Sequence, residues 1–377
     1  MSLSESPADH RLNRRVHPAL FRRANVAVIA AAAISITLTG CSKSESDTTT
    51  PTGTGPAAVA AATTAAAAAG TNCTLAQTGY PKVDLKTAIV GFSQSEKENN
   101  PFRIAETASI KAEATRLGIP ASHMLTTDAQ SDLNKQVSDI KSLLDRGAQL
   151  LIVAPLNSDG LQPAFDAAKA KKVPVVTIDR LVTAKPCTDY LTFIGSNFVQ
   201  QGQRAAAEMI RVTGGKGKLA ILLGASGNNV TTDRTSGFKT GLKAAPGLSV
   251  VAEQTGNFDR TTGQNVMEQL IQSHPDITAV YAENDEMGIG AYNALKAAGK
   301  NPGTDVKIVS IDGTANAVKL IVKGGYNAVI ESNPRFGALA FDTLTKFEAG
   351  TPIPSSIIIT DDQYDETNAK QKVGNAF

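Results

Sequence analysis

Pairs of polar residues follow three apolar segments of the chain, at the positions where a buried strand would pass into a loop. The pairs are Asp179-Arg180 after PVVTI, Asn284-Asp285 after AVYAE and Asp312-Gly313 after KIVSI. In open α/β sheets, ligands bind in the crevice beyond the carboxyl ends of the strands, so polar groups at these positions predict a binding cleft. The sequence offers them no matching nucleophile and base. We therefore expect the cleft to hold a small polar molecule without changing it chemically.

Regular alternation of strands and helices begins at Thr87. Near-continuous apolar runs are typical of strands that are buried on both faces of a parallel sheet. The expected strands are 87–93, 150–155, 174–179, 190–195, 218–224, 249–254, 279–283 and 307–312, and an isolated late strand is expected at 356–360 after a helix. Between the first two, apolar residues recur at helical spacing, with Asp128 or Ser131 as the cap and Gly147 at the end. This alternation predicts the α/β class with doubly wound sheets.

Two similar α/β units are expected, because a single sheet with so many strands would be unusually large. They would form two lobes that face one cleft, and several chain crossings between the lobes would act as a hinge. The expected N-terminal lobe comprises residues 81–195 and 333–355, and the expected C-terminal lobe comprises 196–332 and 356–377.

The first 40 residues have the pattern of a secretory signal. An arginine-rich region ends at Arg23, and the apolar stretch from Val26 to Leu38 is too short for a comfortable transmembrane helix. The sequence Leu-Thr-Gly-Cys that follows resembles a bacterial lipobox, in which the cysteine, here Cys41, is lipidated and becomes the first residue. We expect an exported protein held by lipid at the outer face of the cytoplasmic membrane, at the cell surface or in the periplasm. An uncleaved membrane anchor is the alternative.

Residues 42–70 consist mostly of Ser, Thr, Pro, Gly and Ala, a composition that cannot bury a core. We expect a lipid-anchored flexible tether over residues 41–80. Cys73 and Cys187 would then be the two remaining cysteines, and an even pair outside the cytoplasm favours a disulfide. Two free thiols are the alternative, and a zinc site has too few ligands to draw on.

The charge distribution argues against a nucleic-acid partner. The chain has a net charge of +2, which comes from the arginines of residues 1–40, and the rest is nearly neutral. The segment TGGKGK lacks the full phosphate-loop pattern, so no cofactor is expected. A monomer is expected.

A glycosidase is the competing class of function, because Asp179 and Asp312 could in principle act as its acid and base. However, Arg180 would hold its neighbour ionised, and no carboxyl in an apolar setting stands out as an acid. We therefore predict a binding protein that is not an enzyme.

Six segments cover nearly all of residues 85–365: GFSQ with PFR, TIDR, TDRTSGF, GNFDR, YAENDEMGIGA and SIDGT. In these segments and their order the chain resembles the type I periplasmic sugar-binding proteins of bacterial ABC importers. GFSQ, RIAET, ENDEM and SIDG are most similar to galactofuranose-binding proteins, with ribose-binding proteins next. The resemblance implies two Rossmann-like lobes, joined by three strands, that close on a monosaccharide and dock on an ABC transporter permease. Repressors of the same fold carry a helix-turn-helix where this chain has its signal and tether. A secreted protein that feeds a receptor instead of a transporter is an alternative.

The resemblance also assigns the main binding residues. Phe102 and Phe258 would lie against the faces of the sugar ring, since C–H groups that point at a π-face are favourable; the alternative places either ring in the core. Asp179 and Arg180 would satisfy a hydroxyl as acceptor and donor, unless they form only a mutual salt bridge. The corresponding residues of the second lobe would be Arg234, Asn284 and Asp312.

Further candidates are Arg103, Asp128, which is equally a helix cap, and the loop residues Gln94 and Asn228. Ribose binders usually have a polar amide before the proline of the last crossing, where this chain has Glu331-Ser332-Asn333-Pro334. That departure puts ribose itself in doubt and makes Asn333 a further candidate.

Overall fold

A computed structural model describes residues 65–67 and 71–377. The predicted signal peptide, the lipidation site Cys41 and most of the predicted tether lie outside these residues. Among the described helices, none is both long and apolar enough to cross a membrane. Both lobes described below belong to one structural unit, which spans residues 58–377.

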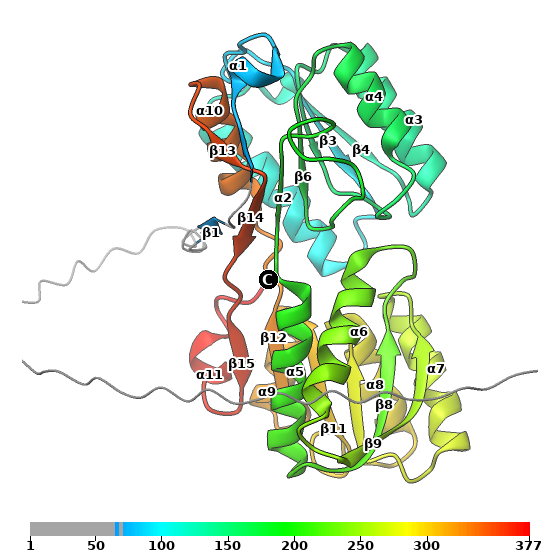
Figure 1. Cartoon of the computed structure of the whole chain (residues 1–377). Coiled ribbons are helices and arrows are strands. Elements are labelled where there is room, and N and C mark those ends of the chain that lie inside the picture. The colour runs from blue at the N-terminus through cyan, green and yellow to red at the C-terminus, as the bar shows by residue number, and fades with distance from the viewer. Residues whose placement is uncertain (1–64, 68–70) are drawn as a thin grey trace, which may run out of the picture. The chain divides into compact units, whose positions relative to one another are not determined.

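The N-terminal lobe contains a seven-stranded sheet with the strand order β1-β14-β7-β6-β5-β3-β4 (Figure 1). Its strands are β1 (Ala65–Ala67), β3 (Val90–Gln94), β4 (Met124–Asp128), β5 (Leu150–Val153), β6 (Val175–Ile178), β7 (Thr192–Gly195) and β14 (Ser356–Ile359). All neighbours pair in parallel except β1 and β14, which are antiparallel. The helices are α2 (Pro101–Arg116), α3 (Leu133–Asp145), α4 (Gln162–Ala170) and α10 (Gly337–Glu348). Strands β3, β5, β6 and β7 are fully buried, which explains their near-continuous apolar sequences.

The C-terminal lobe contains a six-stranded sheet with the order β15-β12-β11-β10-β8-β9. Its strands are β8 (Lys216–Leu223), β9 (Gly247–Thr255), β10 (Ala279–Ala282), β11 (Lys307–Asp312), β12 (Ala328–Glu331) and β15 (Gln363–Asp365). Its helices are α5 (Phe198–Thr213), α6 (Asn229–Leu242), α7 (Arg260–Ser273), α8 (Asp285–Ala297), α9 (Ala315–Val322) and α11 (Ala369–Lys372). The two parallel-sheet lobes confirm the predicted α/β class.

Helices α5 and α6 pack backbone against backbone, and glycine makes this possible. A Cβ atom at Gly202 of α5 would collide with the carbonyl oxygen of Arg234 in α6. A Cβ at Gly237 of α6 would likewise collide with the carbonyl oxygen of Val199 in α5. The close approach fixes the position of α6, and with it the side chain of Arg234.

The chain crosses between the lobes three times: from β7 to α5, from β12 to α10 and from β14 to β15. Strand β14 pairs in parallel with β7, with Ser356 opposite Phe193, and so completes the N-terminal sheet. The predicted boundary at residue 356 therefore needs correction, because the third crossing lies between Ile359 and Gln363. The elements after β12 are divided between the lobes: β14 lies between β1 and β7 in the N-terminal sheet, and β15 is the edge strand beside β12 in the C-terminal sheet.

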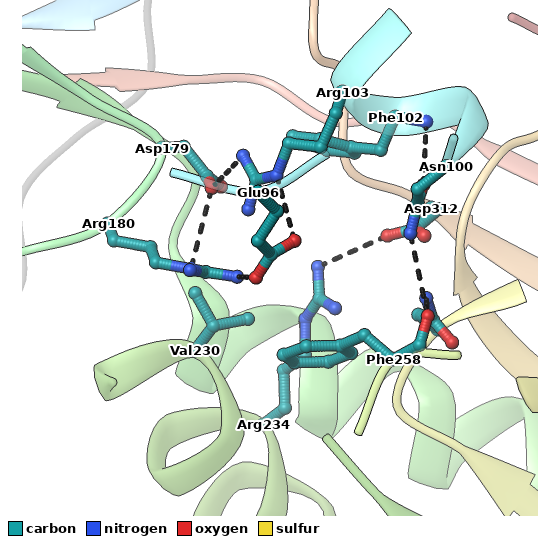
Figure 2. Close-up of a pocket in the computed structure, with 11 residues that line it drawn as sticks. Glu96, Asn100, Phe102, Arg103, Asp179, Arg180, Val230, Arg234, Phe258 and Asp312 are labelled. Atoms are coloured by element: carbon teal, nitrogen blue, oxygen red, sulfur yellow. Dashed lines mark hydrogen bonds and ion pairs between the residues drawn. The ribbon is translucent and has the colours of Figure 1, made fainter. Parts of the chain in front are cut away.

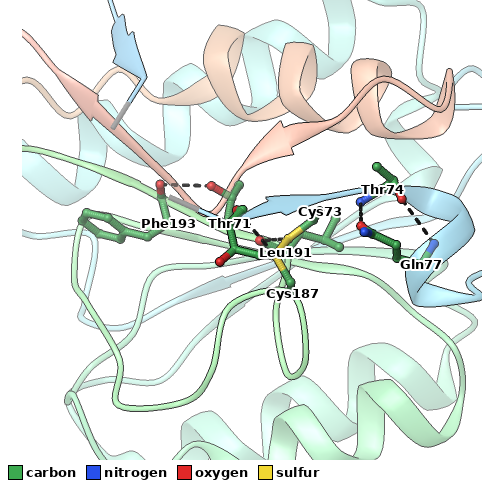
Figure 3. Close-up of a disulfide and its surroundings, with 8 residues drawn as sticks. Thr71, Cys73, Thr74, Gln77, Cys187, Leu191 and Phe193 are labelled. Carbon is green, nitrogen blue, oxygen red and sulfur yellow. Dashed lines mark hydrogen bonds between the residues drawn. A yellow bond between two sulfur atoms is a disulfide. The ribbon is translucent and has the colours of Figure 1, made fainter. Parts of the chain in front are cut away.

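The folded body begins earlier than the predicted tether boundary at residue 80. Within that range the structure has β2 (Asn72–Cys73) and α1 (Leu75–Thr78), and β2 pairs with β13 (Ile353–Pro354). Thr74 caps α1 in a reciprocal capping box with Gln77. Figure 3 shows the disulfide that joins Cys73 to Cys187 beside this segment. It ties the entering chain to the loop that follows β6.

Removing the disulfide is expected to destabilise the protein. The two cysteines are 114 residues apart, so the bridge restricts a long loop of the unfolded chain. We expect the double variant Cys73→Ser, Cys187→Ser to lose about 2–4 kcal/mol of unfolding free energy, measured by guanidinium denaturation. Reductant should shift the native protein in the same direction and leave the variant unchanged. Equal midpoints for the two proteins would contradict a stabilising bridge.

Candidate functional site

A pocket lies between the lobes, at the carboxyl ends of strands from both sheets (Figure 2). Its lining from the N-terminal lobe is Glu96, Asn100, Phe102, Arg103, Asp179 and Arg180. The lining from the C-terminal lobe is Val230, Arg234, Phe258, Asn284 and Asp312. The structure thus brings together eight of the predicted binding residues: Phe102, Arg103, Asp179, Arg180, Arg234, Phe258, Asn284 and Asp312.

Buried charges of the N-terminal lobe neutralise one another across the pocket wall. Arg103 Nη1 donates to Asp179 Oδ2 at 2.7 Å, and Arg103 Nε donates to Glu96 Oε2 at 3.1 Å. Arg180 Nη2 donates to Glu96 Oε1 at 2.6 Å, whereas Arg180 Nε lies 3.7 Å from Asp179 Oδ2. Asp179 and Arg180 therefore do not form only a mutual salt bridge, because each has a shorter contact with another residue. Figure 2 shows Glu96 between the two guanidinium groups.

Glu96 stays ionised in this network. Burial would raise its pKa, but the charges of Arg180 and Arg103 outweigh burial and lower the pKa to about 2. Glu106, which is fully buried, accepts a hydrogen bond from Arg103 Nη1 at 2.9 Å. Burial raises the pKa of Glu106 to about 7, against the opposing charge of Arg103. Arg103 is thus held in place by three carboxyl groups.

Arg234 and Asp312 face this network from the C-terminal lobe. Arg234 Nε donates to Gln201 Oε1 at 2.9 Å, and Arg234 Nη1 donates to the carbonyl oxygen of Glu283. Its Nη2 atom lies 3.6 Å from Asp312 Oδ1, beyond normal hydrogen-bond distance. Burial raises the pKa of Asp312 well above its usual range, and nearby Asp285 adds to the effect. A ligand hydroxyl between Arg234 and Asp312 would satisfy both groups.

The two predicted rings line the pocket and are nearly buried. The guanidinium carbon of Arg103 lies 5.0 Å from the ring centre of Phe102. The same ring packs edge to face against Phe377 of the other lobe. The guanidinium of Arg180 lies 6.0 Å from the ring centre of Phe258. Both rings therefore lie beside charged groups of the pocket and also belong to the buried hydrophobic clusters of the protein, so the pocket and the core share them.

Backbone strain is concentrated at the pocket. Asp179, Phe258 and Asp312 have φ angles of 66°, 58° and 141°, a region that side chains larger than glycine rarely adopt. At Phe258 this conformation directs the ring over Gly224, where a Cβ atom would collide with the ring. Such strain persists only where surrounding contacts enforce it, and it clusters at functional sites.

Asn284 lines the pocket, but its amide also has structural contacts. Its Oδ1 atom accepts from Met287 N and so caps α8, and its Nδ2 atom donates to the carbonyl oxygen of Phe258. Asn284 therefore holds the strained turn of Phe258 in addition to facing the pocket.

Four predicted residues lie outside this pocket. Gln94 is fully buried and donates to Glu106 and Thr107, and Asn333 lies on the second crossing, where its Oδ1 atom accepts from Arg335 N. Asn228 caps α6 and reaches only the wall of a neighbouring pocket.

Asp128 lies at the end of edge strand β4, away from the lining of the pocket. Its Oδ1 atom accepts from Gln130 N. The alternative of a helix cap is also wrong for Asp128, and for Ser131 as well, because Asp132 caps α3 by accepting from Lys135 N.

Glu96, Asn100 and Val230 line the pocket and were missed by sequence reasoning. Asn100 precedes Pro101 and caps α2, and this pair is a sequence pattern typical of a helix start. The Nδ2 atom of Asn100 also lies 3.5 Å from the carbonyl oxygen of Phe258. Glu96 lies two residues after the end of strand β3, whereas Asp179 follows β6 directly, so the sequence signal at Glu96 is weaker. Val230 offered no signal beyond its place in a helix.

Comparison with known proteins gives this site its context. A family model described as "Periplasmic binding protein domain" matches residues 90–351. The galactofuranose-binding protein YtfQ of Escherichia coli K12 is 33% identical over 275 residues, which is 72% of this chain and 85% of that protein. The ribose import binding protein RbsB of Bacillus subtilis 168 is 36% identical over 273 residues, again 72% and 85%.

Solved structures agree in fold. The crystal structure of a galactofuranose binding protein superposes with a TM-score of 0.73 at 32% identity and covers 76% of this chain and 97% of that one. The arabinose-transporter binding component from Shewanella sp. ANA-3, bound to L-arabinofuranose, gives 0.72 at 32% identity, with 76% and 94% covered. This chain therefore belongs to the family of type I periplasmic sugar-binding proteins, by its sequence, its two parallel-sheet lobes and the charged pocket between them.

Proposed function

We propose that the protein is an extracytoplasmic solute-binding lipoprotein that captures a monosaccharide and delivers it to an ABC transporter permease. The sugar would be galactofuranose-like, ribose-like or galactose-like. The observation that carries the proposal is the placement of charged groups from both lobes around one pocket flanked by Phe102 and Phe258. Paired carboxylates and guanidinium groups satisfy hydroxyls as acceptors and donors, and the ring faces suit the C–H groups of a sugar.

Binding would exchange internal ion pairs for contacts with the sugar. The pocket as it stands has a volume of about 30 Å³, since arginines and carboxylates of its wall hold one another. That volume suits about two water molecules. A sugar ring would therefore separate Arg103 and Arg180 from their carboxylates and take over part of their hydrogen bonds. The protein acts by binding, and we assign it no chemical step.

A sugar panel tests the proposal. We expect isothermal titration calorimetry to detect a pentose or hexose with a Kd well below 1 mM, because several charge-assisted hydrogen bonds each contribute about 1.5–3 kcal/mol. The panel would include D-galactose, D-ribose and L-arabinose as free sugars and as methyl furanosides. Absence of binding to every member at millimolar concentration would refute the proposal.

Lipid attachment at Cys41 is a separate part of the proposal, and it rests on the sequence Leu-Thr-Gly-Cys. We expect Cys41→Ser to move the protein from the membrane fraction to the soluble fraction, and to abolish labelling by a fatty-acid analogue. Cys73→Ser is the matched control and should remain in the membrane fraction. A Cys41→Ser protein that stays in the membrane fraction would favour the uncleaved anchor.

A further inference from the structure

A second, wider pocket adjoins the pocket described above. We call the first the inner pocket and the second, with a volume of about 580 Å³, the outer pocket. They share four lining residues: Glu96, Asn100, Arg180 and Phe258. The outer volume falls within the usual 300–1,000 Å³ of small-molecule sites. The two pockets therefore adjoin each other across these four residues, and their volumes are very unequal.

The outer pocket lies on the side of the cleft away from the three crossings. Arg180 after β6 and Glu286 after β10 contribute to its lining, but most of the lining comes from the segments after β3, β4, β5, β8 and β9. In both sheets these strands lie toward the edge opposite the crossing strands, which are β14 and β7 in one lobe and β15 and β12 in the other. A ligand too long for the inner pocket would reach the outer pocket past the four side chains that the two pockets share.

The outer pocket is present although the lobes already touch. Ser158 N donates to the carbonyl oxygen of Gly227 at 2.9 Å, and Leu181 N donates to Asn229 Oδ1 at 2.9 Å. Each of these hydrogen bonds joins one lobe to the other. A space of about 580 Å³ thus remains beside the inner pocket while the lobes are in contact.

The walls of the outer pocket suit hydroxyl groups. Both lobes contribute amide side chains, which donate and accept hydrogen bonds as hydroxyl groups do. They include Asn99, Asn157 and Asn257. Charges are present as well, and Arg260 and Glu286 hold each other in a two-pronged pair at 2.7 and 3.0 Å. A lipid or other apolar group would leave these polar walls unsatisfied, whereas a second sugar unit would pair with them.

We propose that the ligand is a sugar that carries a hydroxyl-rich substituent, such as a disaccharide, with its terminal ring in the inner pocket and its second unit in the outer pocket. This inference rests on the proposed function and extends its ligand from a free monosaccharide to a sugar with a second hydroxyl-rich unit. It predicts that the outer unit adds affinity, because it meets donors and acceptors that a free monosaccharide leaves in contact with water.

Calorimetry on the full mature protein tests the inference with matched probes. For each monosaccharide of the panel that binds, the probes are the free sugar, its methyl glycoside and its (1→5)-linked disaccharide, such as arabinobiose for L-arabinose. We expect the disaccharide to bind about tenfold more tightly than the methyl glycoside, as one or two added hydrogen bonds would give.

A variant that fills the outer pocket locates the effect. Ser226 is exposed and lines the outer pocket without lining the inner one. Ser226→Trp should reduce the ratio between disaccharide and methyl-glycoside affinities to about one or below. Ser249→Trp, at an exposed position of β9 outside both linings, is the matched control and should keep the ratio of the unmodified protein.

The outcomes separate the two proposals. If a monosaccharide binds and its disaccharide binds equally or more weakly, the extended ligand is refuted while the sugar-binding function stands. A tenfold gain that survives Ser226→Trp, in a variant with an unchanged circular dichroism spectrum, would also refute the assignment to the outer pocket. If no sugar of any series binds, the proposed function fails, and the inference fails with it.

Discussion

Arg234→Ala is expected to weaken sugar binding by about 100-fold or more. The guanidinium is buried and faces Asp312 across the inner pocket, so it can give a sugar two charge-assisted hydrogen bonds. Losing two such bonds, at about 1.5–3 kcal/mol each, gives at least this factor. Calorimetry against the sugar identified in the panel measures the effect. Arg234→Lys should also lose much of the affinity, because one ammonium group cannot replace the fork that holds Gln201 and the Glu283 carbonyl.

The matched control is Arg211→Ala on α5. Arg211 is 42% exposed and pairs with Glu208 and Glu366 at the surface. This variant should bind sugar as the unmodified protein does, and thermal unfolding should show that both variants are folded. Unmodified affinity in folded Arg234→Ala protein would refute the assignment of the site.

Gly202→Ala is expected to cause a large loss of stability for a single methyl group. The added methyl group would meet the carbonyl oxygen of Arg234, and a backbone atom cannot move aside as the end of a flexible side chain can. Helices α5 and α6 would have to separate, at a cost of about 3 kcal/mol. We expect a lower midpoint in urea unfolding and weaker sugar binding, because α6 carries Arg234.

Gly374→Ala provides the control for this substitution, since a Cβ atom there has no neighbour within 4 Å among the described residues. It should leave both the unfolding midpoint and sugar affinity unchanged. If Gly202→Ala behaved in the same way, the close approach of the two helices would not limit stability.

The architecture and the inner pocket were predictable because they depend on local pattern. Buried parallel strands have continuous apolar sequences, and their carboxyl ends meet at one edge, so the sequence alone was enough to group Asp179, Asn284 and Asp312. Several short or edge strands were missed, and β4 and β12 are examples. Strand β4 is half-buried at a sheet edge, and β12 is four residues long and ends in Glu331.

Positions that depend on pairing between distant segments were not predictable. The partner of β14 is β7, about 160 residues earlier, and nothing within either segment specifies that register. Asp128 was a candidate because it ends a strand, but β4 is last in the sheet order, which places its end away from the inner pocket. In the segment SEKENN, the sequence does not distinguish Glu96, which lines the pocket, from exposed Glu98.

The disulfide determines which lobe would transmit mechanical force in an anchored protein. The chain enters the body through β1 and β2, and Cys73 bonds covalently to Cys187 of the N-terminal lobe. Tension along a membrane tether would therefore end at this covalent bond and would bypass the three crossings. The N-terminal lobe would be the stationary part relative to the membrane, and opening or closing would swing the C-terminal lobe without pulling on the anchor.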